Sequence, residues 1–142
     1  MRHALALAQE AASLGEVPIG AVVMHRGDVI ATGHNTPRTD HDPTAHAEII
    51  AIRKAAKALG QERLGACELW VTLEPCAMCA GAISNARIAK LYYAASDPKG
   101  GAVEYGARVF EQEQCLHRPE VYSGMGEEQA VKLLQEFFQA RR

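Results

Sequence analysis

Two short strings, thirty residues apart, constrain this chain more than any other feature. They are His46-Ala47-Glu48 and Pro75-Cys76-Ala77-Met78-Cys79. An imidazole and two thiols are typical zinc ligands, and three protein ligands leave the fourth tetrahedral position open for water, as in catalytic sites. A fold that uses both strings must bring them together around one ion. We therefore predict one Zn²⁺ per subunit, bound by His46, Cys76 and Cys79.

Each string alone is weak evidence. A Cys-x-x-Cys pair also occurs in structural zinc sites and in thioredoxin-like redox motifs, and the pattern also has to be weighed against no metal at all. A redox pair would leave His46 and Glu48 without a role. Metal binding does not require the carboxylate of Glu48, whereas a reaction at a zinc site requires a proton carrier. We assign Glu48 as the catalytic general base and later proton donor.

Length and composition restrict the remaining choices. A chain of 142 residues, of which 48% are hydrophobic and 23% charged, is typical of one globular domain, here residues 1–142. Its net charge of −2 argues against a wholly basic nucleic-acid surface but leaves room for a local basic patch. No apolar run suits a secretory signal or a membrane span, so we expect a cytoplasmic protein in which Cys67 and Cys115 are reduced.

The hydrophobic pattern predicts the elements along the chain. Apolar residues at helical spacing and strand-like apolar runs alternate, with Gly15 and Gly60 as helix stops. The predicted elements are a helix over 2–14, a hairpin of 19–24 and 29–33, a helix from Asp42-Pro43-Thr44 to Leu59, a strand over 69–73, a helix over 75–86, a strand over 88–94, a short strand at Val121-Tyr122 and a helix over 127–140.

This order predicts an α/β fold, with a five-stranded mixed sheet between helices in three α/β/α layers and with room for a further helix before the last strand. We expect helices to cover the strand 69–73 on both faces and Trp70 to lie in the core. Ligand sites of open α/β sheets lie at the carboxyl edge. His46 and Glu48 are separated by roughly 200° around a helix, so they can converge only on an ion at the helix N-terminus.

Several further segments carry a resemblance to a known family. They are Val17-Pro18-Ile19-Gly20-Ala21, Asn35, Asp42 to Ile49, Val71 to Ala82, Asp97 to Ala102 and Phe137-Phe138. With the two strings above, the chain resembles the zinc-dependent cytidine/deoxycytidylate deaminase superfamily, and most closely bacterial tRNA adenosine deaminases of the TadA type. The resemblance implies a cytidine-deaminase-like fold and a homodimer.

The same resemblance implies an activity: hydrolytic conversion of adenosine to inosine at the wobble position of a tRNA anticodon stem-loop. Glu48 would protonate the ring and then the departing amine. The implied substrate-binding residues are Asn35, Ala47, Pro75, Asp97, Lys99 and Phe138.

Other interpretations of these residues stay open. Asn35 also fits a turn, Asp97 to Gly101 also fits an ordinary loop, and Phe137 and Phe138 also fit a core, so that at most one of them meets RNA. The rival functions are deamination of a free base or nucleoside, with guanine the most plausible, and a non-catalytic zinc module. Cytidine deaminases usually carry glycine where this chain has Ala77.

Overall fold

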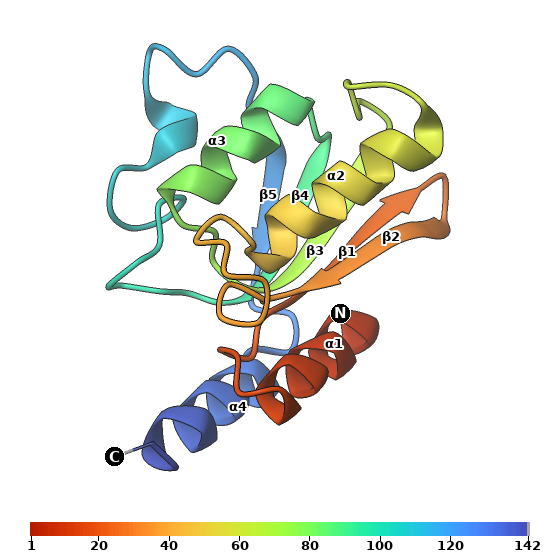
Figure 1. Ribbon diagram of the computed structural model, residues 1–142. Coiled ribbons are helices and arrows are strands. Elements are labelled where there is room, and N and C mark those ends of the chain that lie inside the picture. The colour runs from red at the N-terminus through yellow and green to blue at the C-terminus, as the bar shows by residue number, and fades with distance from the viewer. Residues whose placement is uncertain (142) are drawn as a thin grey trace.

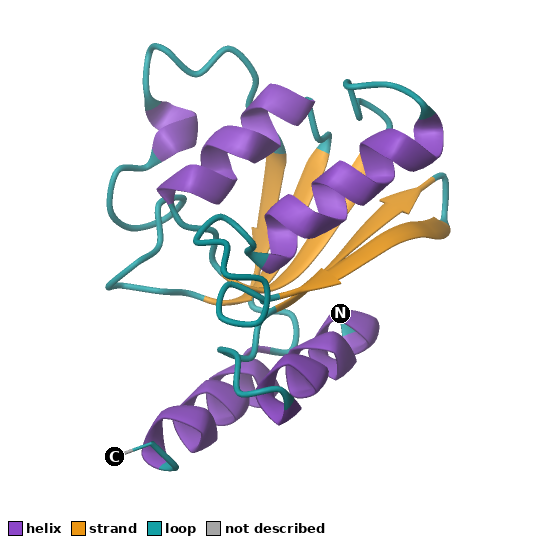
Figure 2. Ribbon diagram, in the orientation of Figure 1, coloured by secondary structure: helices purple, strands orange, loops and turns teal. Residues whose placement is uncertain are grey.

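The computed structural model describes residues 1–141 of the chain, and Figure 2 distinguishes the helices, strands and loops of this part. None of the helices within these residues combines the length and the apolar character that a membrane span requires. In chain order the elements are α1 (Arg2–Ser13), β1 (Gly20–His25), β2 (Asp28–His34), α2 (Ala47–Leu59), β3 (Cys67–Leu73), α3 (Ala77–Ala86), β4 (Lys90–Ala95), η1 (Val109–Glu111), β5 (Glu120–Ser123) and α4 (Glu127–Gln139).

The strands found within residues 1–141 form one five-stranded sheet in the order β2-β1-β3-β4-β5. β1 pairs with β2 and β3 in antiparallel orientation, and β4 runs parallel to β3 and β5. The helix α3 provides the long crossover that the parallel pair β3 and β4 needs. Between β4 and β5, where a further helix was allowed, the chain forms only the short 3₁₀ helix η1. The predicted mixed sheet is confirmed.

Helices cover both faces of this sheet. Figure 1 shows α2 and α3 on one side and α1 and α4 on the other. The main hydrophobic core lies beneath α2 and α3, where Ala51 and Ala80 belong to the same buried cluster as the strand residues Leu69 and Val71. A smaller cluster joins α1 and α4 to the end of β4. The molecule therefore has the predicted three-layer α/β/α architecture.

The strand β3 is only partly covered on its second face. Leu69 and Val71 are fully buried beneath α2 and α3, and the alternation of a strand places Trp70 on the opposite face. There Trp70 is partly exposed and stacks on Tyr92, with ring centroids 3.8 Å apart, and Tyr92 stacks on Tyr122 at 5.0 Å. The expected cover by helices on both faces therefore does not extend to Trp70.

The helix α2 begins later than predicted. His46, with an extended backbone (φ −77°, ψ 152°), is its N-cap, and the helix does not start at Asp42-Pro43-Thr44. Asp42 caps a local turn instead, because its Oδ1 accepts the backbone N–H of Thr44 at 2.9 Å and the Thr44 hydroxyl at 2.7 Å. The end of α2 agrees with the prediction, since Gly60 is the C-cap with φ 65°.

Two glycines allow helices to approach the hairpin closely. A Cβ at Gly33 would lie 2.5 Å from the carbonyl oxygen of Ala47, and a Cβ at Gly20 would lie 2.1 Å from the carbonyl oxygen of Ala4. Both distances are shorter than any van der Waals contact, so each position needs a residue without a side chain. Gly33 thereby brings the first residue of α2 against β2, and Gly20 brings α1 against β1.

Candidate metal centre and active site

The three predicted metal ligands lie together. The Nδ1 atom of His46 is 3.6 Å from the Cys76 sulfur and 3.5 Å from the Cys79 sulfur. All three ligand atoms lie within 4.8 Å of one another, with Cys79 buried and the other two side chains partly exposed. The structure thus brings the two strings of the sequence to one point.

Local structure explains this convergence. His46 is the N-cap of α2 and Cys76 is the N-cap of α3, and both have extended backbones. Cys79 lies in the first turn of α3, three residues after Cys76, so the two sulfurs share one side of that turn. The positive end of a helix dipole also favours thiolates. Two helix N-termini therefore meet, as the two-residue spacing of His46 and Glu48 predicted.

The geometry of the cluster fits zinc. Bonds of about 2.3 Å to sulfur and about 2.1 Å to nitrogen, at a tetrahedral angle, place nitrogen and sulfur about 3.6 Å apart. The observed distances from His46 to Cys76 and Cys79 agree with this value. The imidazole nitrogen thus lies at the distance from both sulfurs that binding of a shared zinc ion requires.

The two thiols differ strongly in acidity. A hydrogen bond from Cys79, helped by one from His46, outweighs burial and lowers the pKa of Cys76 to about 4. The same hydrogen bond, together with burial, raises the pKa of Cys79 far above its usual range. One thiolate and one thiol thus share a proton, which a divalent cation would replace, since metal binding to cysteine releases protons.

Glu48 lies in the first turn of α2 beside this cluster and is 4% exposed. Burial raises its pKa to about 7, although its own backbone N–H, the nearby His46 and a hydrogen bond with Cys79 act in the opposite direction. The pKa of His46 is also raised, chiefly by its hydrogen bond with Cys76. A carboxyl group with a pKa close to neutrality suits a residue that accepts and donates a proton.

Asn35 and Ala47, both predicted to hold a base, contact each other. Asn35 is 5% exposed, and its Oδ1 accepts the backbone N–H of Ala47 at 2.9 Å. The backbone N–H of Asn35 donates to the Ile19 carbonyl at 3.1 Å. The side chain therefore ties the end of the hairpin to the start of α2, next to His46, and its role toward a substrate stays a prediction.

Asp97 and Lys99 lie in a loop that packs against the start of α3. The Asp97 Oδ1 accepts the backbone N–H groups of Lys99 and Gly100 at 3.1 and 3.0 Å, which closes the kind of turn that an ordinary loop would contain. Pro75 is buried, and its carbonyl accepts the N–H of Ala102 at 2.9 Å. The contacts of Pro75, Asp97 and Lys99 with a substrate stay predictions.

The two adjacent phenylalanines of α4 differ in exposure. Phe137 is 7% exposed and Phe138 is 49% exposed, and their rings meet edge to face with centroids 5.3 Å apart. Phe138 alone of the two is exposed enough to meet an RNA.

Cys67 and Cys115 are free thiols, as expected, and Cys115 lies 3.4 Å from the Ser84 hydroxyl.

Two buried carboxylates near the site were not identified from the sequence. Glu16, 1% exposed, accepts the N–H and the hydroxyl of Thr39, both at 2.7 Å, in the loop before His46. Glu74, 2% exposed, accepts four backbone N–H groups from the loop that contains Asp97. A glutamate at the end of an apolar strand was a visible signal, but its partners lie far away in the sequence.

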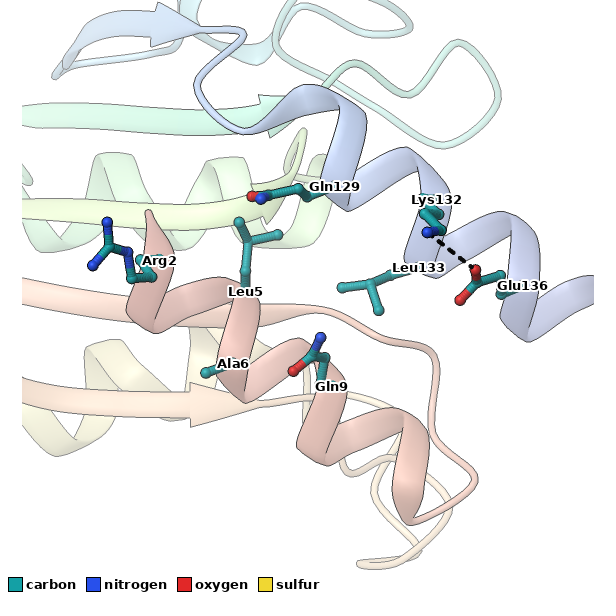
Figure 3. A pocket seen from close by; sticks show the side chains of 8 residues that line it. All are labelled: Arg2, Leu5, Ala6, Gln9, Gln129, Lys132, Leu133 and Glu136. Carbon is teal, nitrogen blue, oxygen red and sulfur yellow. Dashed lines mark ion pairs between the residues drawn. The ribbon is translucent and has the colours of Figure 1, made fainter.

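A groove of about 400 Å³ lies away from this cluster, between α1 and α4 on the opposite face of the sheet. Figure 3 shows that side chains of both helices line it. They are Arg2, Leu5, Ala6, Gln9, Gln129, Lys132, Leu133 and Glu136. Lys132 and Glu136 form an ion pair there at 3.9 Å.

Comparisons with known proteins agree with this site. The sequence pattern of the MafB19-like deaminase family matches residues 1–142. The chain is 56% identical to the tRNA-specific adenosine deaminase of Agrobacterium fabrum, over all of this chain and 93% of that protein.

Solved structures of deaminases also resemble this chain. One from a study of A-to-I editing by tRNA:A34 deaminases at the wobble position of transfer RNA superposes with a TM-score of 0.93 at 57% identity, over 94% of this chain and 97% of that one. A guanine deaminase from Bacillus subtilis superposes with a TM-score of 0.65 at 48% identity, over 67% of this chain and 61% of that one. From the full-length match and the high identities it follows that the chain belongs to the MafB19-like deaminase family.

Proposed function

We propose that this protein is a tRNA adenosine deaminase that hydrolyses adenosine to inosine at the wobble position of an anticodon. The observation that carries the proposal is the cluster of His46, Cys76 and Cys79 with the buried carboxylate of Glu48 beside it. The full-length similarity to a tRNA-specific adenosine deaminase supports this substrate.

His46, Cys76 and Cys79 would hold one zinc ion, which when bound acts as a Lewis acid and activates a water for attack on C6 of adenine. Glu48 accepts a proton from the water, donates it to N1 of the ring and then passes a proton to the departing amine. Adenosine and water thereby give inosine and ammonia. The burial of Glu48 keeps bulk water from competing for these protons.

Residues near the cluster, together with Phe138 near the end of α4 on the other face of the sheet, suit recognition of an extruded nucleotide and its neighbours. The Asn35 Oδ1 accepts the N–H of Ala47, and the side-chain NH₂ would donate to a base. Pro75 would orient the exocyclic amine from the start of α3. Asp97 and the exposed Lys99 would contact the sugar and phosphate. Phe138 offers a ring for stacking, which every base accepts.

Two arginines that lie beside Gly15 could contact RNA phosphates despite the net negative charge of the chain. The Arg38 guanidinium donates to the Gly15 carbonyl at 3.4 Å, and the Arg141 guanidinium lies beside Gly15 from the end of α4. Extrusion of a base costs a few kcal/mol, least where stacking is weak, so an anticodon loop is a suitable substrate. A tRNA substrate also implies action in the cytoplasm.

The test compares four substrates: an anticodon stem-loop with wobble adenosine, free adenosine, guanine and cytidine, with inosine or ammonia as the readout. We expect only the stem-loop to react. Glu48→Gln should retain one zinc per subunit and lose about 10²- to 10⁴-fold of the activity, because a positioned proton carrier contributes that much. Equal activity of the two proteins would refute the proposed role of Glu48. Failure of the zinc-loaded wild type to deaminate any of the four substrates would leave a non-catalytic zinc module as the better interpretation.

Guanine deamination is the second candidate, because a guanine deaminase shares 48% identity over two thirds of this chain. The two candidates differ in their use of Lys99 and Phe138, which would contact an RNA and which a free base would not need. Reaction of guanine alone in the four-substrate assay would favour this candidate.

We further propose a homodimer. The outer side of α3 presents Met78, Gly81 and Ala82, spaced as one helical face, and Met78 is 37% exposed. A self-complementary contact between such faces is typical of twofold dimers. Light scattering should give twice the chain mass, and a monomer at working concentration would refute the dimer.

A further inference from the structure

Glu74 has surroundings that its place in the sequence does not explain. It lies between the end of β3 and the Pro75-Cys76 pair, and its side chain is 2% exposed. A buried carboxylate is costly unless hydrogen bonds or a cation compensate it. Here the compensation comes entirely from backbone N–H groups of one loop.

The two carboxylate oxygens accept four backbone N–H groups. Oε1 accepts the N–H of Asp97 at 2.9 Å. Oε2 accepts the consecutive N–H groups of Val103, Glu104 and Tyr105 at 3.1, 3.0 and 3.1 Å. Successive N–H groups that point to one centre form a concave anion-binding nest. In this protein the nest is filled by the chain's own Glu74.

The loop of residues 96–105 is closed tightly around this carboxylate. A Cβ at Gly101 would lie 2.4 Å from the Glu74 carboxyl group, so any larger residue there would displace it. The N–H of Gly101 donates to the Asp97 carbonyl, and the N–H of Ala102 donates to the Pro75 carbonyl, both at 2.9 Å. Glu74 and its neighbour Pro75 together attach the loop to the start of α3.

We infer that Glu74 is a positioning residue, which holds the loop of Asp97 and Lys99 in a fixed place relative to the His46, Cys76 and Cys79 cluster. The inference rests on the proposed function, because the loop matters only if its residues meet a substrate. Since Glu74 is two residues before Cys76, the connection between the ligand helix and the loop is short and buried. All four hydrogen bonds of the carboxylate come from the loop, so loss of its charge should weaken substrate binding more than the chemical step.

The experiment compares the wild type with Glu74→Gln, Glu74→Asp and Glu104→Gln. Glu104 is the control, because it is a carboxylate of the same loop that accepts hydroxyls, from Tyr93 and Ser96, which a glutamine oxygen can also accept. The readouts are zinc content, hydrogen exchange of the loop amides, and kcat and KM for the stem-loop with wobble adenosine.

We expect Glu74→Gln to keep its zinc, to lose exchange protection at residues 103–105 and to raise KM about tenfold with a smaller change in kcat, as the loss of charge-assisted hydrogen bonds implies. Glu74→Asp should have a KM between those of Glu74→Gln and the wild type. Glu104→Gln should have the KM of the wild type. Unchanged KM in Glu74→Gln, or an equal rise in Glu104→Gln, would overturn the inference.

Two outcomes separate this inference from the proposed function. If the wild type does not deaminate the stem-loop, the proposed function fails, and the inferred link to substrate binding fails with it. The exchange protection at residues 103–105 still reports whether Glu74 holds the loop. If Glu74→Gln does not fold, Glu74→Asp decides: a raised KM with zinc retained supports the inference, and an unchanged KM overturns it.

Discussion

On each face of the sheet, one helix approaches a strand closely at a glycine. The two faces differ in which helix residues this close approach holds in place. On one face, α2 approaches β2 at Gly33, and the residue pressed against the strand is Ala47, between His46 and Glu48. On the other face, α1 approaches β1 at Gly20, and the residue in contact is Ala4, which is neither a predicted metal ligand nor next to one in the sequence. The same kind of close contact therefore positions His46 and Glu48, the predicted metal ligand and proton carrier, on one face, and positions α1 against the sheet on the other.

Packing differs between the faces as well. The core beneath α2 and α3 is larger and contains fully buried residues of both helices and of β3 and β4. The α1 and α4 face has the smaller cluster, a groove between the two helices and the partly open stack of Trp70, Tyr92 and Tyr122. We conclude that dense packing is concentrated where side chains must be held in place.

The largest expected effect comes from replacing a predicted metal ligand on the densely packed face, beneath α2 and α3. Cys79→Ala should abolish zinc binding and reduce deamination more than about 100-fold, because loss even of a group that only orients a ligand costs about 10- to 100-fold. Cys67→Ala, which removes another fully buried thiol beneath the same helices, is the control and should retain zinc. Metal analysis and stem-loop deamination check both. Full zinc in Cys79→Ala would contradict the proposed site.

Substitution of Gly33 and Gly20 tests directly whether the two faces of the sheet differ. Gly33→Ala and Gly20→Ala should both lower the free energy of unfolding by about 1–3 kcal/mol, because each new methyl group clashes with helix backbone. Only Gly33→Ala should also lower the activity per folded protein, by up to about 100-fold, since small displacements of catalytic groups cost that much. Denaturant unfolding and kinetics at full folding measure the two effects. Equal losses of activity would break the comparison.

Core truncation should show the difference in packing. Ile83→Ala on α3 removes a fully buried side chain and should lower the free energy of unfolding by about 2–5 kcal/mol. Leu133→Ala on α4 removes a partly exposed side chain beside the groove and should cost about 1 kcal/mol. Urea unfolding of both variants provides the measurement, and equal costs would show that the two faces are packed alike.

Glu16 connects the two faces, since it follows α1 and bonds the loop before His46. Burial would raise its pKa, but hydrogen bonds from Thr39 and Arg38 outweigh burial and lower it. The resulting stability is present above the unfolded-state pKa of about 4.3 and is lost as the pH falls through the lower folded-state pKa.

Glu16→Gln should therefore unfold about 1–3 kcal/mol more easily at neutral pH, the usual contribution of charge-assisted hydrogen bonds. The difference from the wild type should shrink as the pH falls below about 4, because the protonated wild-type side chain is also uncharged. Unfolding measured across this range checks the prediction. A difference that does not depend on pH would show that the charge of Glu16 is not what holds the loop.

The convergence of His46, Cys76 and Cys79, the element order and the mixed sheet could be predicted from the sequence because short-range patterns carry them. Cys76 and Cys79 share a helix turn through their spacing alone, and the hydrophobic periodicity of each segment indicates its type. The later start of α2 could not be predicted, because an aspartate such as Asp42 can either cap a helix or close a turn, here with Thr44. Partial exposure of Trp70 depended on how far α1 and α4 extend over the sheet.

The sequence by itself indicated that a histidine, two cysteines and a glutamate belong to one site, because a reaction at a zinc ion uses all four side chains, whereas a redox pair would leave the histidine and the glutamate without a role. Only the tertiary structure decided that Glu16 and Glu74 support the loops beside it. Their partners lie 22 to 31 residues away and are backbone N–H groups together with the Thr39 hydroxyl. Every residue except proline has such an N–H group, so the residue type of a partner does not reveal the contact.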